Sequence, residues 1–166
     1  MIEGCVIKLT RSTVSSVSEL TGTRATTAGP RLDATSLGEA GAFLRTLGMA
    51  IDEISATRVT AHLDLGPDHH TPWGIVHGGV YTSAVESVAS IGASTAVRDR
   101  GQVAVGLTNT THFLRPLSAG RVNVEAVPLS QGRTQQLWRV DITDGSAKLI
   151  AHGEVRLQNV AGQVAD

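Results

Sequence analysis

A stretch of twenty residues, 78–97, contains a single charged residue, Glu86. It is rich in Ala, and apolar residues recur four positions apart, as at Val80 and Ala84, which is typical of a helix. Because Val, Ile and Ala occupy most sides of this predicted helix, it has no broad polar face to turn toward water. Other elements must therefore cover it, and the fold must surround one long helix.

Segments of alternating apolar and polar residues lie on both sides of this helix in the sequence, which is the pattern of strands with one buried face. Short turns join the last four segments, and this favours an antiparallel meander. The order of elements predicts the fold class α+β, with an antiparallel sheet of about six strands wrapped around one long central helix. The predicted strands span residues 49–55, 58–65, 103–114, 120–129, 134–143 and 147–157.

The N-terminal part of the chain differs in composition from the rest. Residues 10–27 are mostly Ser and Thr and have no sustained helical or strand period. We therefore predict a weakly ordered extension over residues 1–35, the alternative being a short strand or helix at 5–9. One domain is predicted over 36–158, followed by a C-terminal tail at 159–166.

A short amphipathic helix is predicted at the start of this domain. Ser36 and Glu39 have the spacing of a capping box, in which each side chain hydrogen-bonds the backbone N–H of the other residue. Leu44 and Leu47 follow at helical spacing. Gly48 is then placed to end the helix.

The charge balance excludes several classes of partner. The chain has 14 Lys and Arg against 15 Asp and Glu, a net charge of −1, which argues against nucleic acid as its main partner. It lacks an apolar run long enough to span a bilayer, and its first residues lack the pattern of a secretory signal. We therefore expect a cytoplasmic protein with no membrane partner. The single cysteine, Cys5, excludes an internal disulfide and a Cys-based zinc site.

No metal site is predicted from the six histidines. Three of them, His69, His70 and His77, share one loop but lack the His-x-x-x-His helical spacing and an acidic partner. Three others are expected at the surface or along a pocket, because they fall within predicted strands: His62, His112 and His152.

Glu86 is the first candidate for chemistry. A carboxylate removed from water is costly unless it is paired or used. Glu86 therefore either marks the solvent-facing stripe of its helix or serves as a nucleophile or general base. Its helical neighbours are small, and three of the four carry hydroxyl groups: Thr82, Ser83, Ala89 and Ser90.

The start of the same helix is the second candidate. Gly78 and Gly79 follow His77, and glycines at a helix start leave backbone N–H groups accessible at its partly positive end. Such N–H groups can polarise a carbonyl and stabilise an oxyanion. Gly78 and Glu86 are separated by about 12 Å along the helix axis. This spacing favours a site assembled at a dimer interface from two copies of the chain.

Three segments of the chain resemble the PaaI-like acyl-CoA thioesterases of the hotdog-fold superfamily. They read PWGIVHGGVYTSAVESVASIGAS, TNTTHFLRPLSAGRVNVEA and QGRT, and the resemblance extends over about 44–157. The segment VESVAS is similar to a branch that includes one type of 4-hydroxybenzoyl-CoA thioesterase. The resemblance implies a curved sheet around one helix, a homodimer with sheets joined edge to edge and commonly paired into a tetramer, and hydrolysis without a metal or cofactor.

The resemblance also implies roles for individual residues. The Gly78 amide is implied to polarise the thioester carbonyl, and Gly79 beside it to contact the substrate. Glu86 is implied to act as nucleophile or as base for a water, in a position where many family members have Asp. Ser90 is implied to position substrate or water, and His77 to orient the loop or the thioester.

One position departs from the family pattern. The family usually has Asn or Gln six residues before the motif histidine, where this chain has Thr71. Either Thr71 replaces that amide, or a shift of the loop allows His70 to do so. Trp73 in the same loop is expected either to line the acyl pocket or to plug the loop against the sheet.

Arginine side chains suit the phosphates of CoA because guanidinium binds phosphate bidentately. Arg133 and Thr134, at a turn with accessible backbone, are the better candidates. Arg115 could bind phosphate or brace its own turn, and Arg121 and Arg139 could equally lie on solvated strand faces.

The sequence therefore predicts metal-independent hydrolysis of an acyl-CoA thioester to a carboxylic acid and CoA. Two alternatives remain at this stage. One is a hotdog dehydratase or hydratase, although such enzymes usually pair a His with an acid in a different motif. The other is an acyl-CoA binding module without catalytic activity.

Overall fold

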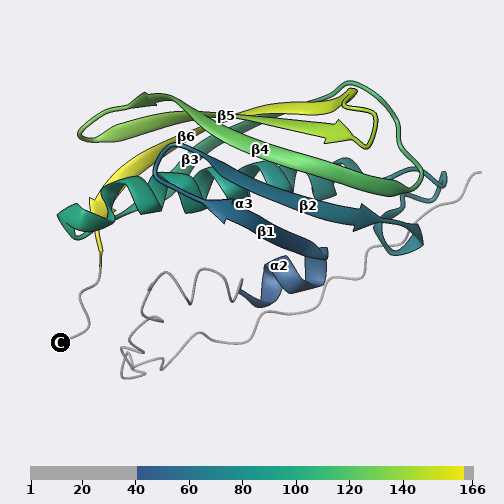
Figure 1. The fold of residues 1–166 in the computed structure, drawn as a ribbon, viewed down its shortest axis with the longest axis horizontal. Coiled ribbons are helices and arrows are strands. Elements are labelled where there is room, and N and C mark those ends of the chain that lie inside the picture. The colour runs from purple at the N-terminus through teal and green to yellow at the C-terminus, as the bar shows by residue number, and fades with distance from the viewer. Residues whose placement is uncertain (1–40, 163–166) are drawn as a thin grey trace, which may run out of the picture.

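A computed structural model describes residues 41–162 of the chain, and it contains the predicted long helix and six strands. Figure 1 shows the sheet curving over α3, with α2 beside β1. The α+β prediction is confirmed. The elements are α2 (Ala42–Leu47), β1 (Met49–Ile54), β2 (Val59–Leu65), η1 (Pro67–His69), α3 (Gly78–Val97), η2 (Arg98–Arg100), β3 (Gln102–Phe113), β4 (Gly120–Gln131), β5 (Gln135–Asp144) and β6 (Leu149–Ala161).

The strand order is β1-β2-β4-β5-β6-β3, and every neighbouring pair is antiparallel. The prediction of a meander through the last four strands is wrong for β3, which pairs with β6 at the edge of the sheet rather than with β4. Alternation along a strand specifies which face is buried but carries no information about the neighbouring strand. Here β4 pairs with β2, so β3 is left for the opposite edge.

The long helix is buried against the concave face of the sheet. The α3 residues that are fully buried are Ala84, Val85, Val88, Ala89, Ala93 and Val97. Across from them, Trp138 of β5 packs so closely on Gly92 that a Cβ there would lie 2.6 Å from the indole ring. The absence of a Cβ at this position therefore allows helix and sheet to approach one another.

The first helix and the last strand of the described residues differ in extent from the predicted elements. Helix α2 begins at Ala42, and the predicted capping box at Ser36 and Glu39, like the predicted extension over 1–35, lies outside the described residues. Gly48 ends α2 in a left-handed conformation (φ 73°), as predicted. Strand β6 runs on to Ala161, past the predicted limit of residue 157, because the first residues of β3 continue the ladder to that point.

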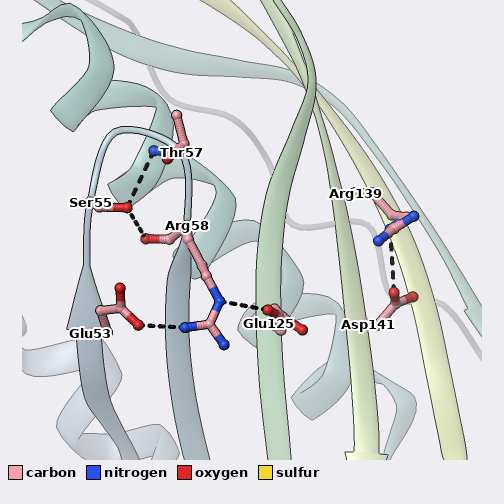
Figure 2. Close-up of polar contacts among 7 residues, drawn as sticks. All are labelled: Glu53, Ser55, Thr57, Arg58, Glu125, Arg139 and Asp141. Carbon is pink, nitrogen blue, oxygen red and sulfur yellow. Dashed lines mark hydrogen bonds and ion pairs between the residues drawn. The ribbon is translucent and has the colours of Figure 1, made fainter.

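The outer face of the sheet carries polar and charged side chains, as Figure 2 shows. Arg58 lies between two carboxylates, with Nη1 2.5 Å from Glu53 and Nε 2.7 Å from Glu125. Arg139 pairs with Asp141, two residues further along β5. None of the helices in the described part of the chain is long and apolar enough to cross a membrane.

Candidate active site

Glu86 is a residue of α3, and its side chain lies between this helix and the edge strand β3. Both of its carboxylate oxygens accept hydrogen bonds. Ser90 Oγ donates to Oε1 and Asn109 Nδ2 donates to Oε2, and each donor–acceptor distance is 3.1 Å. Gly106 of β3 faces the same carboxylate, and a Cβ on Gly106 would lie 2.5 Å from Oε1. Glu86 is partly buried. The carboxylate is thus hydrogen-bonded by side chains of both elements and partly shielded from water.

The sequence analysis missed Asn109, and a bulge in β3 explains why. The pairing of β3 with β6 shifts between Gly106 and Thr108, so that Leu107 is an extra residue in the strand. A bulge changes which residues of a strand face the core. As a result, Gly106 before the bulge and Asn109 after it both face Glu86. A Gly inside a strand pattern indicates such a bulge, so Gly106 was the signal in the sequence that could have predicted it.

The two glycine N–H groups at the start of α3 differ in their hydrogen bonding. His77 is the N-cap residue, and its Nδ1 accepts a hydrogen bond from the Gly79 N–H over 2.9 Å. The Gly79 amide, a predicted substrate contact, is therefore occupied by the cap. For the Gly78 N–H, the described residues contain no hydrogen-bond acceptor.

Aromatic rings border this helix start. The Phe113 ring lies over Gly78, where an added Cβ would approach its Cζ to 2.8 Å, and 56% of the Phe113 surface is exposed. Tyr81 lies one turn further along α3, with its ring centroid 6.3 Å from that of Phe113. Burial raises the pKa of the Tyr81 hydroxyl. The Phe113 ring therefore forms an apolar wall beside Gly78, with the buried Tyr81 ring next to it.

Polar side chains of the loop before α3 form hydrogen bonds within the loop and with the segment that follows β3. Thr71 Oγ1 donates to the Ile75 carbonyl over 3.1 Å and accepts from the Trp73 N–H over 3.3 Å. His70 Nε2 contacts the Ser118 carbonyl. Neither residue is hydrogen-bonded to Glu86 of its own chain. Trp73 is 83% exposed, so the interpretation that it plugs the loop against the sheet is wrong.

The candidate phosphate ligands lie in different places. Arg121 makes two hydrogen bonds to Asp64, at 2.8 and 2.6 Å, and these hold the pKa of that carboxyl below its ordinary value. Arg115 is exposed in the segment after β3, which contacts the loop before α3. Thus Arg121, and likewise Arg139 with its Asp141 partner, belongs to the outer face of the sheet.

Arg133 and Thr134 lie in the turn between β4 and β5. The largely buried Asn159 holds this turn through Nδ2, which donates to the carbonyls of Gly132 and Arg133. Gln136 joins Asn159 to the Ala93 carbonyl in α3. Ala93 lies about 22 Å along the helix from Gly78. The structure therefore does not bring Arg133 and the Gly78 amide of one chain together.

Of the three histidines in the described strands, two have acidic partners, and His112 stacks on another histidine ring. His62 pairs with Asp52, and His152 pairs with Asp141 and stacks on His112 with ring centroids 6.4 Å apart. Among residues 41–162, no group of three or more His, Cys, Asp or Glu is arranged to hold a metal ion. Cys5 lies outside the described residues.

Comparison with known proteins gives consistent matches. The model of the thioesterase superfamily matches residues 74–151. The Rv1847 protein of Mycobacterium tuberculosis, provisionally named an esterase, is 42% identical over 120 residues, which cover 71% of this chain and 86% of that protein. Its solved structure has a TM-score of 0.71 to this chain and covers 74% of this chain and 98% of that one, at 41% identity.

Two further relatives carry more specific names. The 1,4-dihydroxy-2-naphthoyl-CoA hydrolase of Listeria monocytogenes is 30% identical over 105 residues, which cover 63% of this chain and 85% of that protein. The solved thioesterase HI1161 of Haemophilus influenzae is 25% identical, with a TM-score of 0.73, and covers 81% of this chain and 95% of that one. The match extends over most of the described sheet and helix.

Proposed function

Because this chain belongs to the thioesterase superfamily, as a PaaI-like member with the hotdog fold, we propose that it hydrolyses an acyl-CoA thioester to a carboxylic acid and free CoA. The observation that carries the proposal is the Glu86 carboxylate, held by Ser90 and Asn109. It lies on the helix that begins at Gly78, whose N–H has no acceptor among the described residues. The relative named as a CoA-thioester hydrolase supports CoA thioesters as the substrate class.

The chemistry follows from these two groups. The Gly78 N–H donates to the thioester carbonyl oxygen and stabilises the negative charge that develops there. Glu86 either accepts a proton from a water whose oxygen adds to the carbonyl carbon, or adds to that carbon itself and forms an anhydride that water then hydrolyses. In both routes the carbon–sulfur bond breaks. The oxygen of water enters the acid, and the thiolate of CoA takes up a proton.

The site is assembled from two copies of the chain. Gly78 and Glu86 of one chain are about 12 Å apart along α3, too far to act on the same carbonyl group. The edge strand β3 carries apolar side chains that are half exposed, Val105 and Leu107. An edge strand with such side chains is suited to pairing with another chain. A homodimer joined at β3 would place Gly78 of one protomer near Glu86 of its partner, and two such dimers would form a tetramer.

The remaining candidate residues serve substrate binding in this proposal. Trp73 and Phe113 border the acyl group, because both are exposed aromatic side chains near the start of α3. Arg115 lies at this end of the helix, and Arg133 with Thr134 lies at the other. In a shared site the phosphates of CoA therefore bind Arg115 from one protomer or the Arg133 turn from its partner.

The test uses two substitutions at Gly78 that differ in one hydrogen-bond donor. Proline is tolerated at the first residue of a helix, and the extended His77 (ψ 133°) accepts a following proline. Gly78→Pro removes the N–H, whereas Gly78→Ala keeps it and adds a similar Cβ beneath Phe113. We expect Gly78→Pro to lower kcat at least about 100-fold, and Gly78→Ala to stay much closer to the wild type. Thiol release from a panel of acyl-CoAs is the measurement.

Glu86→Gln completes the test. Loss of thiol release in this variant supports the carboxylate role, while wild-type activity would overturn it. Equal activities of Gly78→Pro and Gly78→Ala would overturn the role of the amide. Hydration of an enoyl-CoA without thiol release would instead favour a hydratase, and binding of acyl-CoA without turnover would favour a binding module.

A further inference from the structure

We propose that Asn109 is a positioning residue for the reaction: it holds the Glu86 carboxylate in the orientation that reacts, and Thr111 sets the orientation of the Asn109 amide. The proposal rests on the proposed role of Glu86. It assigns a function to the β3 bulge, which turns Asn109 toward α3.

The Asn109 amide uses both of its N–H groups on α3. One donates to Glu86 Oε2 and the other to the carbonyl oxygen of Thr82, each over 3.1 Å. The Thr82 carbonyl is part of the helix backbone and cannot move independently. Because the two N–H groups of an amide lie in one plane, an amide anchored on Thr82 defines the direction from which Oε2 accepts its hydrogen bond.

Thr111 determines which end of the amide faces Glu86. Thr111 Oγ1 lies 2.7 Å from Asn109 Oδ1 and donates to it. If the amide turned over, its oxygen would face the Glu86 carboxylate and the Thr82 carbonyl, acceptor against acceptor, and its NH₂ would face Thr111. The Asn109 amide therefore has one favoured orientation. The two hydrogen bonds of its NH₂ group and the one to its oxygen all require it.

The carboxylate is thereby held from three sides. Ser90 binds Oε1, Asn109 binds Oε2, and the bare backbone of Gly106 closes the side where a Cβ would collide with Oε1. A carboxylate has about four acceptor positions, so two hydrogen bonds leave room for a water or a carbonyl carbon. All of these partners are neutral, so they orient Glu86 without forming an ion pair.

Two variants test the proposal. Asn109→Ala removes the donor, and Thr111→Val removes the hydroxyl that sets the amide orientation while nearly conserving side-chain volume. We expect Asn109→Ala to lower kcat about 10- to 100-fold, as for a lost hydrogen bond to a charged group, with KM changed much less. Thr111→Val should lower kcat by a smaller factor. The control is Thr110→Ala, at an exposed position between them, which should keep wild-type kcat and KM.

A double-mutant cycle separates positioning through Glu86 from a general structural role. In a Glu86→Gln background, adding Asn109→Ala should leave the residual rate unchanged, because Asn109 acts through the carboxylate. The same fold-loss in both backgrounds would overturn the proposal, as would a rise in KM at constant kcat. Thermal unfolding verifies that each variant is folded. If Asn109→Ala does not fold, Thr111→Val decides, and a wild-type kcat in that variant overturns the proposal.

The same experiment separates the proposed role of Glu86 from that of Asn109. Wild-type activity in Glu86→Gln would overturn the proposed function of Glu86 itself. An inactive Glu86→Gln together with a fully active Asn109→Ala would overturn only the role of Asn109.

Discussion

At the scale of single residues, two glycines lie where a neighbouring side chain occupies the space that a Cβ would need. At Gly106 the space is occupied by the Glu86 carboxylate, and at Gly92 by the Trp138 indole. The same substitution to Ala therefore has different consequences at the two positions. At Gly106 the obstructed group is the end of a flexible side chain, whereas at Gly92 it is a fully buried ring.

Gly106→Ala is predicted to lower activity while leaving the protein folded. The new Cβ would lie 2.5 Å from Glu86 Oε1, so the carboxylate must move. A displacement of about 1 Å in a reacting group can cost on the order of 100-fold in rate. Measurement of kcat beside the thermal midpoint checks this. A variant with wild-type kcat would show that the position of the carboxylate is not restricted by Gly106.

Gly92→Ala is predicted to destabilise the fold by about 1–3 kcal/mol through overpacking. The new Cβ would lie 2.6 and 2.7 Å from two carbons of the Trp138 ring and 3.0 Å from Val59. Urea denaturation gives the free energy of unfolding. The matched control is Gly145→Ala, where a Cβ meets nothing within 4 Å, and a loss of stability there equal to that of Gly92→Ala would contradict the argument.

At the scale of elements, helix α3 and strand β3 together create the candidate site. The helix supplies an N-terminus capped by His77 through the Gly79 amide, while the Gly78 amide has no acceptor among the described residues. The strand supplies a bulge that turns Asn109 toward Glu86. Neither element contains the arrangement by itself, because the carboxylate is held by side chains from both.

The turn between β5 and β6 predicts a dependence of stability on pH. Asp144 Oδ1 accepts the backbone N–H groups of Lys148 and Ser146, over 3.0 and 2.8 Å, and these bonds lower the pKa of Asp144 below its ordinary value. A carboxyl whose pKa is lower in the folded than in the unfolded state stabilises the fold above its unfolded pKa, about 3.9, and loses that contribution as pH falls through the folded pKa.

Wild-type protein should therefore lose stability more steeply than Asp144→Asn as pH falls below about 4, because Asn does not titrate. Thermal midpoints of both proteins at pH 6 and at pH 3 give the comparison. Equal losses in the two proteins would show that Asp144 contributes nothing to the acid sensitivity.

At the scale of the whole molecule, a shared site predicts complementation between two inactive chains. Gly78→Pro lacks the amide and Glu86→Gln lacks the carboxylate, but a mixed dimer contains one site with both groups intact. Random assortment makes half of the dimers mixed, each with one of two sites active, so about a quarter of wild-type activity should return. Co-expression with two different affinity tags isolates the mixed dimer. No recovery in that dimer would mean that both groups act within one chain.

Much of the local structure could be predicted from the sequence. The predicted helix agrees with α3, Gly78–Val97, because its apolar periodicity and its glycines are local signals. The strands agree within a few residues, since alternation is also local. Glu86 and Gly78 were identifiable because one charge within an apolar helix and two glycines at its start stand out in the sequence, whereas Ser90 was identified through the resemblance to the thioesterase family.

The sequence by itself thus determined the helix, the strands, the buried faces and the residues of α3 that carry the proposed chemistry. The tertiary structure alone decided that β3 lies at the edge beside β6, and that Asn109 and Gly106 both face Glu86. The physical reason is that periodicity records only whether a residue is buried. Strand order and the bulge arise from hydrogen bonds between segments far apart in the chain, and a shift of one residue moves a side chain to the other face of the sheet.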